Sequence, residues 1–116
     1  MAQIKNFENL NIWKDSRQLV NQIYSLTKLQ SFAKDYQFID HIRRTSISIP
    51  SNISEGFERD GTKEFMHFLF IAKGSCGELR SQLYIAFDQK YIDDQQFDDI
   101  IIRIIALTKS ISSLIK

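Results

Sequence analysis

Residues 45–59 read TSISIPSNISEGFER, and this stretch holds the only proline of the chain, Pro50. Apolar residues on both sides of the proline recur every three or four positions, which is the spacing of one helical face. A proline inside a helix lacks an amide donor and crowds the preceding turn, at a cost of about 3 kcal/mol when nothing compensates. Short polar neighbours can bond to nearby carbonyls and tolerate a bend. The pattern predicts a helix from about Asp35 to Phe57, bent at Pro50, with a surface loop at residues 48–56 as the alternative.

Three further helices are predicted, at about residues 11–29, from Thr62 into the eighties, and from Asp93 onward. Thr62 and Asp93 are N-cap residue types, and Asp93 with Gln96 resembles a capping box. The connections near residues 30–34, 58–61 and 89–92 are short. The apolar faces comprise Ile12, Ser16, Leu19, Ile23 and Leu26; Phe38, Ile42, Ile49, Ile53 and Phe57; Phe65, Leu69, Ala72, Cys76, Leu79, Leu83 and Ala86; and Phe97, Ile100, Ile104, Leu107, Ile111 and Leu114. We therefore predict an all-α fold, an antiparallel up-down-up-down four-helix bundle that forms one domain over residues 1–116.

Composition excludes several classes of protein. The 116 residues are 43% hydrophobic and 25% charged with a net charge of +1, which excludes a disordered tail and a strongly cationic nucleic-acid binder. The single cysteine, Cys76, cannot form an intrachain disulfide, and no cysteine and histidine spacing fits zinc. The first 15 residues have polar side chains every few positions, unlike a signal peptide or a membrane span. A cytoplasmic location without a membrane partner is the expectation.

Two glycines occur inside the third predicted helix, in the sequence GSCGE at residues 74–78. Each glycine costs a helix about 1 kcal/mol relative to alanine, so the pair suggests a tight helix crossing. We interpret Gly74 and Gly77 as the place where the bent helix around Pro50 nests against the third helix.

The run HIRRTSISIPSNISEGFERDGTKEFMHFLFIAKGSCGEL at 41–79, with FENLNIWKDS at 7–16, resembles a bacterial family of four-helix-bundle proteins. These proteins are encoded in intervening sequences of large-subunit ribosomal RNA genes. The resemblance implies a four-helix bundle that assembles as a homo-oligomer, a pentamer. Through the related accessory variability protein of diversity-generating retroelements, it also implies binding to RNA or DNA. That relative is strongly basic, whereas this chain has 15 Lys and Arg against 14 Asp and Glu.

Excess apolar residues support oligomerisation independently of the resemblance. The third helix adds Met66, Phe70, Ile71, Tyr84, Ile85 and Phe87 to its core stripe, and the fourth adds Ile101, Ile102 and Ile105. A four-helix protomer needs about one apolar stripe per helix. We expect some of the excess at a subunit interface, and the alternative is a wider core with a few exposed apolar residues.

Polar residues around Pro50 form a candidate structural cluster. Asn52, Glu55 and Arg59 share one helical face, and Glu55 and Arg59 have the spacing of an ion pair. This cluster either ties the helix to a neighbouring helix or subunit, or forms a polar site shared around a ring. The residues predicted to be structural or interfacial are Ser48, Pro50, Asn52, Glu55, Gly56, Gly74 and Gly77.

The candidate nucleic-acid contacts are basic residues on the first two helices and at the second turn. They are Lys14, Arg17, Arg43, Arg44, Arg59 and Lys63. A ring would repeat such a patch in every subunit, so a near-neutral protomer can still present a basic surface. Scattered basic residues also form ordinary solvated faces. The alternative function is a protein–protein interaction adaptor that binds no nucleic acid.

No catalytic or metal-binding motif is complete. Glu64 and His67 have the Glu-x-x-His spacing of one half of a di-iron site, which needs a second such pair and two further glutamates. His67 and Cys76 fall on opposite faces of one helix, and no glycine-rich phosphate loop follows a strand. The chain is expected to be non-enzymatic and to use no cofactor.

Overall fold

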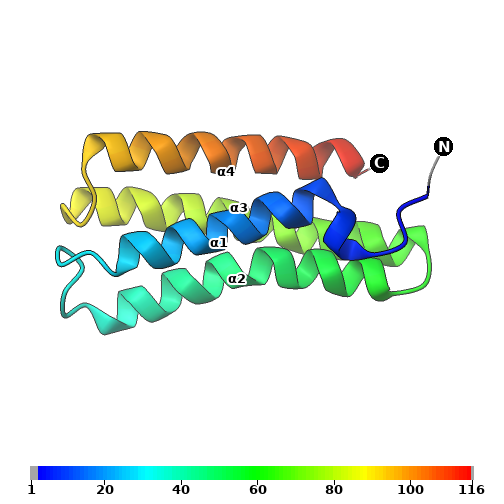
Figure 1. Ribbon diagram of the computed structural model, residues 1–116, viewed down its shortest axis with the longest axis horizontal. Coiled ribbons are helices and arrows are strands. Elements are labelled where there is room, and N and C mark those ends of the chain that lie inside the picture. The colour runs from blue at the N-terminus through cyan, green and yellow to red at the C-terminus, as the bar shows by residue number, and fades with distance from the viewer. Residues whose placement is uncertain (1–2, 116) are drawn as a thin grey trace.

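The computed structural model describes residues 3–115, and within them the chain forms one short 3-10 helix and four long α-helices, with no strand. The short helix η1 spans Phe7–Asn9. The long helices are α1 (Asn11–Thr27), α2 (Tyr36–Glu58), α3 (Thr62–Asp88) and α4 (Asp94–Leu114). Successive helices run in opposite directions, and η1 and the C-terminal end of α4 lie at the same end of the bundle (Figure 1).

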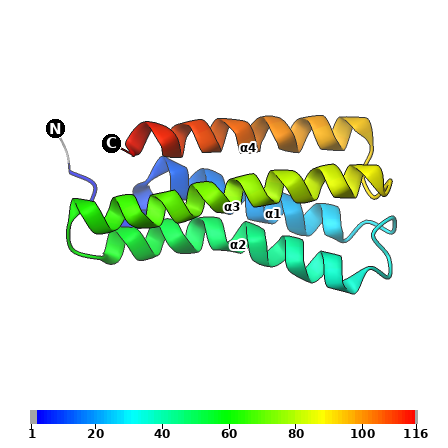
Figure 2. The ribbon, with the colours of Figure 1, turned by 180° about the vertical axis from the view of Figure 1, so that it is seen from behind.

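The four helices form a bundle in which each one packs against two others. Helix α2 packs against α1 and α3, and α4 packs against α3 and α1, whereas the diagonal pairs of helices make no close backbone contact. Figure 2 shows α2 and α3 side by side from behind. The bundle measures 46 × 23 × 20 Å. Because α1 and α3 are diagonal partners, their outward faces point to opposite sides of the molecule.

The core consists of the predicted apolar stripes. Nearly all their residues are buried or pack against the core, including Ile23, Ile42, Leu79 and Ile104, each fully inaccessible to solvent. The prediction for Leu114 was wrong, because 39% of its surface is exposed. Leu114 is the last residue of α4, where the bundle ends. The spacing of apolar residues therefore positions the helices, as expected for an amphipathic bundle.

The helix N-termini follow the predicted caps at two of three sites. The Asp35 carboxylate accepts a hydrogen bond from the Phe38 amide at 3.3 Å, and Asp93 forms a complete capping box with Gln96. The prediction for Thr62 was wrong: Thr62 is the first residue of α3, and Gly61 occupies the cap position with a φ of 108°. Because the connection from α2 is short, it turns through this left-handed conformation, which glycine adopts without strain.

Helix α2 continues through Pro50, so the alternative of a surface loop at residues 48–56 was wrong. Side chains of the preceding turns bond back to the backbone: Ser46 donates to the Arg43 carbonyl at 2.8 Å and Ser48 to the Thr45 carbonyl at 2.6 Å. Such bonds accompany bent helices. Figures 1 and 2 both show α2 changing direction near its middle.

The close contact between α2 and α3 lies at Gly56, not at the glycines of α3. A Cβ on Gly56 would lie 2.6 Å from the Phe68 Cβ, whereas one on Gly74 or Gly77 would meet no atom within 4 Å. The prediction that Gly74 and Gly77 receive the bent α2 was therefore wrong. These two glycines lie on the side of α3 that points out of the bundle, so no helix of the same protomer covers them.

Candidate interaction surfaces

The outward face of α3 carries four large apolar side chains beside charged ones, and no helix of the protomer covers it. Phe70 and Tyr84 have 57% and 53% of their surface exposed, and Ile71 and Ile85 are exposed beside them. Gly74 and Gly77 lie between these residues, as the helical repeat requires. Exposed apolar side chains that recur along one helix face make that face a candidate surface for association.

The excess apolar residues of α3 and α4 divide into two groups. Phe87 packs against Phe97 with ring centroids 5.0 Å apart, and Ile101 is buried in the core. Met66 and Ile105 are partly buried against the same core. The remaining members are exposed, namely Phe70, Ile71, Tyr84, Ile85 and Ile102. A wider core thus accounts for part of the excess. In the second group Tyr84 touches the Phe97 ring of α4, with centroids 5.0 Å apart, but stays more than half exposed.

The outward face of α1 has the opposite character. Its exposed residues are Asn11, Lys14, Asp15, Arg17, Gln18, Asn21, Ser25 and Lys28, all of them polar or charged. Since α1 and α3 are diagonal partners, the bundle has one side that is polar throughout and one side where large apolar side chains accompany charged ones. An assembly that buries the α3 side would leave the α1 side in water.

Most of the candidate nucleic-acid arginines are engaged within the protomer. The Arg43 guanidinium donates through Nε to Thr27 Oγ1 at 2.9 Å and lies over the Tyr24 ring at 4.4 Å. Arg44 pairs with Asp40 at 2.9 Å, one turn earlier in α2. These contacts reduce the freedom of both guanidinium groups to approach a phosphate.

The other candidates lie toward the opposite end of the bundle. Arg59 pairs with Glu55 at 2.9 Å, as predicted, and lies over the Phe68 ring at 5.2 Å. Arg17 lies 5.7 Å from the Trp13 ring, and Lys14 is exposed near it on α1. Lys63 is exposed in the first turn of α3. The bundle thus separates Arg43 and Arg44 from the other four, because α1 begins where α2 ends.

The polar cluster of α2 bonds within its own helix. Asn52 donates through Nδ2 to the Ser48 carbonyl at 2.7 Å, and Glu55 is held by Arg59. Gly56 is buried against α3. Two residues tie this end of α2 to α3: Gly56 through close packing, and Arg59 through its position over the Phe68 ring.

Sequence reasoning missed a polar connection between α2 and α3. Gln82 is 93% buried and donates through Nε2 to Thr45 Oγ1 at 3.0 Å, while Thr45 donates to the His41 carbonyl at 3.0 Å. At the edge of the same contact, His41 Nε2 lies 3.4 Å from Glu78 Oε2. The only signal in the sequence is a glutamine adjoining the core stripe at Leu83, which alone does not identify its partner.

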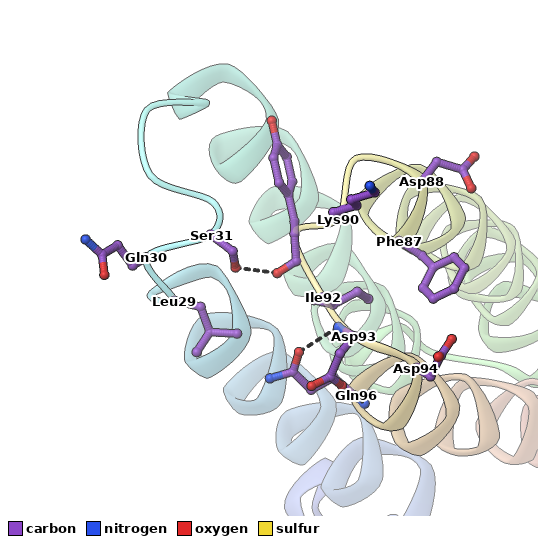
Figure 3. A pocket seen from close by; sticks show the side chains of 11 residues that line it. Leu29, Gln30, Ser31, Phe87, Asp88, Lys90, Ile92, Asp93, Asp94 and Gln96 are labelled. Carbon is purple, nitrogen blue, oxygen red and sulfur yellow. Dashed lines mark hydrogen bonds between the residues drawn. The ribbon is translucent and has the colours of Figure 1, made fainter.

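A cleft lies at the end of the bundle where the α1–α2 and α3–α4 connections meet, and Figure 3 shows its side chains. Ser31 donates a hydrogen bond to the Tyr91 carbonyl, and the Tyr91 hydroxyl donates to Asp35 Oδ2 at 2.7 Å. The bond to Asp35 raises the pKa of Tyr91. The carboxylates at the cleft are Asp88, Asp93 and Asp94. Because Asp93 caps α4 and the other two border helix ends, these groups serve the connection between helices.

Side chains with catalytic potential are dispersed or buried. Burial raises the pKa of the Cys76 thiol to about 11, against a smaller lowering by the hydrogen bond with Thr108. A thiol in this state is a poor nucleophile at neutral pH. Within residues 3–115, no three His, Cys, Asp or Glu side chains are grouped to hold a metal ion, and no helix is long and apolar enough to cross a membrane.

Comparisons with known proteins agree with this architecture. Residues 8–113 match the model of a family described as 23S rRNA-intervening sequence protein. A crystal structure of a protein of unknown function from the S23 ribosomal protein family of Bacteroides thetaiotaomicron VPI-5482 has a TM-score of 0.83 and 24% identity. The alignment covers 90% of this chain and 98% of that one. No curated protein matches the chain.

Proposed function

Since the chain belongs to the 23S rRNA-intervening sequence protein family, we propose that it is a non-enzymatic scaffold that assembles with copies of itself. The family resemblance implies a pentamer, and the single buried cysteine fits a reducing, cytoplasmic setting. The observation that carries the proposal is the outward face of α3, where Phe70 and Tyr84 stay more than half exposed.

The energetics of this face favour assembly. Leaving aromatic side chains in water forgoes about 25 cal/mol for each Å² of apolar surface that a partner would cover. Gly74 and Gly77 each cost α3 about 1 kcal/mol, and no contact in the protomer offsets this cost. A partner that approaches the α3 backbone closely would bury the exposed apolar surface and compensate for the cost of the two glycines.

A second candidate function, binding of RNA or DNA, concerns the polar side of the bundle. Lys14 and Arg17 are exposed on α1, opposite the proposed assembly face. A ring repeats this pair in every subunit, and the affinity for phosphates would fall steeply with salt. The competing candidate is a protein–protein adaptor, which the near-neutral charge of the chain favours.

Light scattering after size exclusion tests the assembly. We expect a species of five times the 13.6 kDa protomer mass, and a monomer would overturn the proposal. Titration of that species with labelled RNA and DNA at low and moderate salt then separates the candidate roles. Salt-sensitive binding that Lys14→Glu weakens supports the nucleic-acid role, and an assembly without binding supports the adaptor.

A further inference from the structure

The outward face of α3 has two distinct edges. Tyr84 marks the α4 side, because its ring lies 5.0 Å from Phe97 of α4. Glu78 marks the α2 side, because its carboxylate lies 3.4 Å from His41 of α2. At about 100° per residue, Phe70, Lys73 and Arg80 fall toward the α4 edge, and Glu64, Ile71 and Ile85 fall toward the α2 edge. Gly77 falls in the same stripe as Phe70 and Tyr84, seven residues from each, and Gly74 falls between the two edges.

The two edges carry opposite charges and similar apolar groups. Lys73 and Arg80 make the α4 edge basic, whereas Glu64 and Glu78 make the α2 edge acidic, and all four side chains are exposed. Each edge also contributes large apolar residues, Phe70 and Tyr84 on one side and Ile71 and Ile85 on the other. Each edge therefore complements the other edge and repels a copy of itself.

We infer that the partner of this face is a second copy of the chain, placed so that the α4 edge of one α3 packs against the α2 edge of a parallel α3. The inference rests on the self-assembly proposed above and adds its contact surface and geometry. A contact between two different edges is heterologous, and it gives a ring when the rotation from copy to copy closes. In the ring proposed above, the subunits are therefore arranged head-to-tail. An antiparallel two-fold pair would instead place Lys73 and Arg80 against the same edge of the partner.

The positions of the residues along the α3 axis, referred to as their heights, fit this arrangement. In a cyclic assembly with parallel helices, contacting residues lie at nearly the same height. Phe70 then meets the neighbour's Ile71, and Tyr84 meets its Ile85. Arg80 lies about 3 Å along the axis from Glu78, within reach of a charge pair. Gly74 and Gly77 lie between the two apolar layers, where their lack of side chains lets the helices approach.

Charge exchange tests the pairing of the edges. Arg80→Glu and Glu78→Arg each place like charges in contact, and we expect each to weaken association at least about tenfold. The double variant restores opposite charges at every contact and should recover the mass of the wild-type assembly. Arg103→Glu reverses an exposed charge on α4, away from α3, and should leave the mass unchanged. Single variants that assemble normally, or a double variant no better than the singles, would overturn the inference.

Added bulk tests the close approach independently of charge. A Cβ at residue 77 would meet no atom of the protomer within 4 Å, and the position is exposed, so Gly77→Leu should keep the helical fold, as circular dichroism would show. We expect this variant to be monomeric, while Ser25→Leu on the polar face of α1 still assembles. Normal assembly of Gly77→Leu would exclude this contact surface while leaving self-assembly intact. A monomeric wild type, in contrast, would remove the proposed function itself.

Discussion

Gly56 leaves no room for a side chain, because a Cβ there would lie 2.6 Å from the Phe68 Cβ. Both atoms belong to long helices in extensive contact, so neither can move alone. We expect Gly56→Ala to lower the free energy of unfolding by about 1–3 kcal/mol, the usual cost of overpacking. Urea denaturation measures this change. Gly74→Ala is the matched control, and at protein concentrations where the chain is monomeric it should be neutral or stabilising by up to about 1 kcal/mol.

The Cys76 thiol gives a second prediction, on pH dependence. Its pKa is raised from 9.0 to about 11 in the folded chain, mainly by burial. Between these values the unfolded thiol loses its proton while the folded one keeps it, so the contribution to stability is present below pH 9 and is lost as pH rises toward 11. Native protein should react with a thiol reagent only as fast as it unfolds.

Comparison with Cys76→Ala isolates the thiol from lysines and tyrosines that titrate in the same range. The unfolding free energy of this variant should decline less between pH 9 and 11 than that of the wild type. Equal slopes, or rapid labelling of the native thiol at pH 8, would contradict the buried state. The chain has one cysteine, so all labelling reports on this site.

Residue roles were harder to predict than residue burial. The sequence predicts that Gly56, Gly74 and Gly77 all lie inside helices. Residue type alone does not tell which of them packs against another helix. Only Gly56 is pressed against a neighbouring helix. Which glycine meets a partner depends on the rotation of each helix about its axis and on the distance between axes, and neither quantity is readable from residue type.

At the scale of the element, replacing Pro50 tests whether the bend of α2 is needed for the fold. Pro50→Ala restores an amide donor for the Ser46 carbonyl, and we expect the bundle to be retained with a free energy of unfolding raised by about 1 kcal/mol. Circular dichroism measures whether the helical bundle is retained, and urea denaturation measures the free energy of unfolding. Ser51→Ala, at the next and exposed position, serves as the control. Loss of nucleic-acid affinity with assembly intact would show that the proline shapes a binding site instead.

The helices themselves were predictable because the signals are local and repeated. The core stripe of α3, from Leu69 to Ala86, keeps its spacing over many turns, and Asp93 with Gln96 fixes the start of α4. The start of α3 was predicted one residue too late because threonine is a common N-cap residue. The actual cap conformation depends on the positive φ of Gly61, which follows from the geometry of a short turn.

At the scale of the whole molecule, the distribution of surface character emerges only from the packing. The sequence has basic residues on both α1 and α2, but antiparallel packing places Arg43 and Lys14 far apart. The Arg43 guanidinium also contacts Tyr24 and Thr27. The apolar face of α3 was expected from its composition, whereas its position diagonal to α1 required the arrangement of the four helices. This division into sides distinguishes the proposed assembly surface from the side that the proposal leaves in water.

The two sides should respond differently to salt. The proposed α3 contact is mainly apolar, with charge pairs at its edges, so its strength depends little on screening. Phosphate binding on the α1 side depends on charge alone, and the Debye length falls from about 10 Å at 0.1 M to about 3 Å at 1 M salt. We expect the mass from light scattering to stay constant over this range while any RNA or DNA affinity disappears. Dissociation in 1 M salt would mean that Arg80 and Glu78, rather than Phe70 and Tyr84, supply most of the association energy.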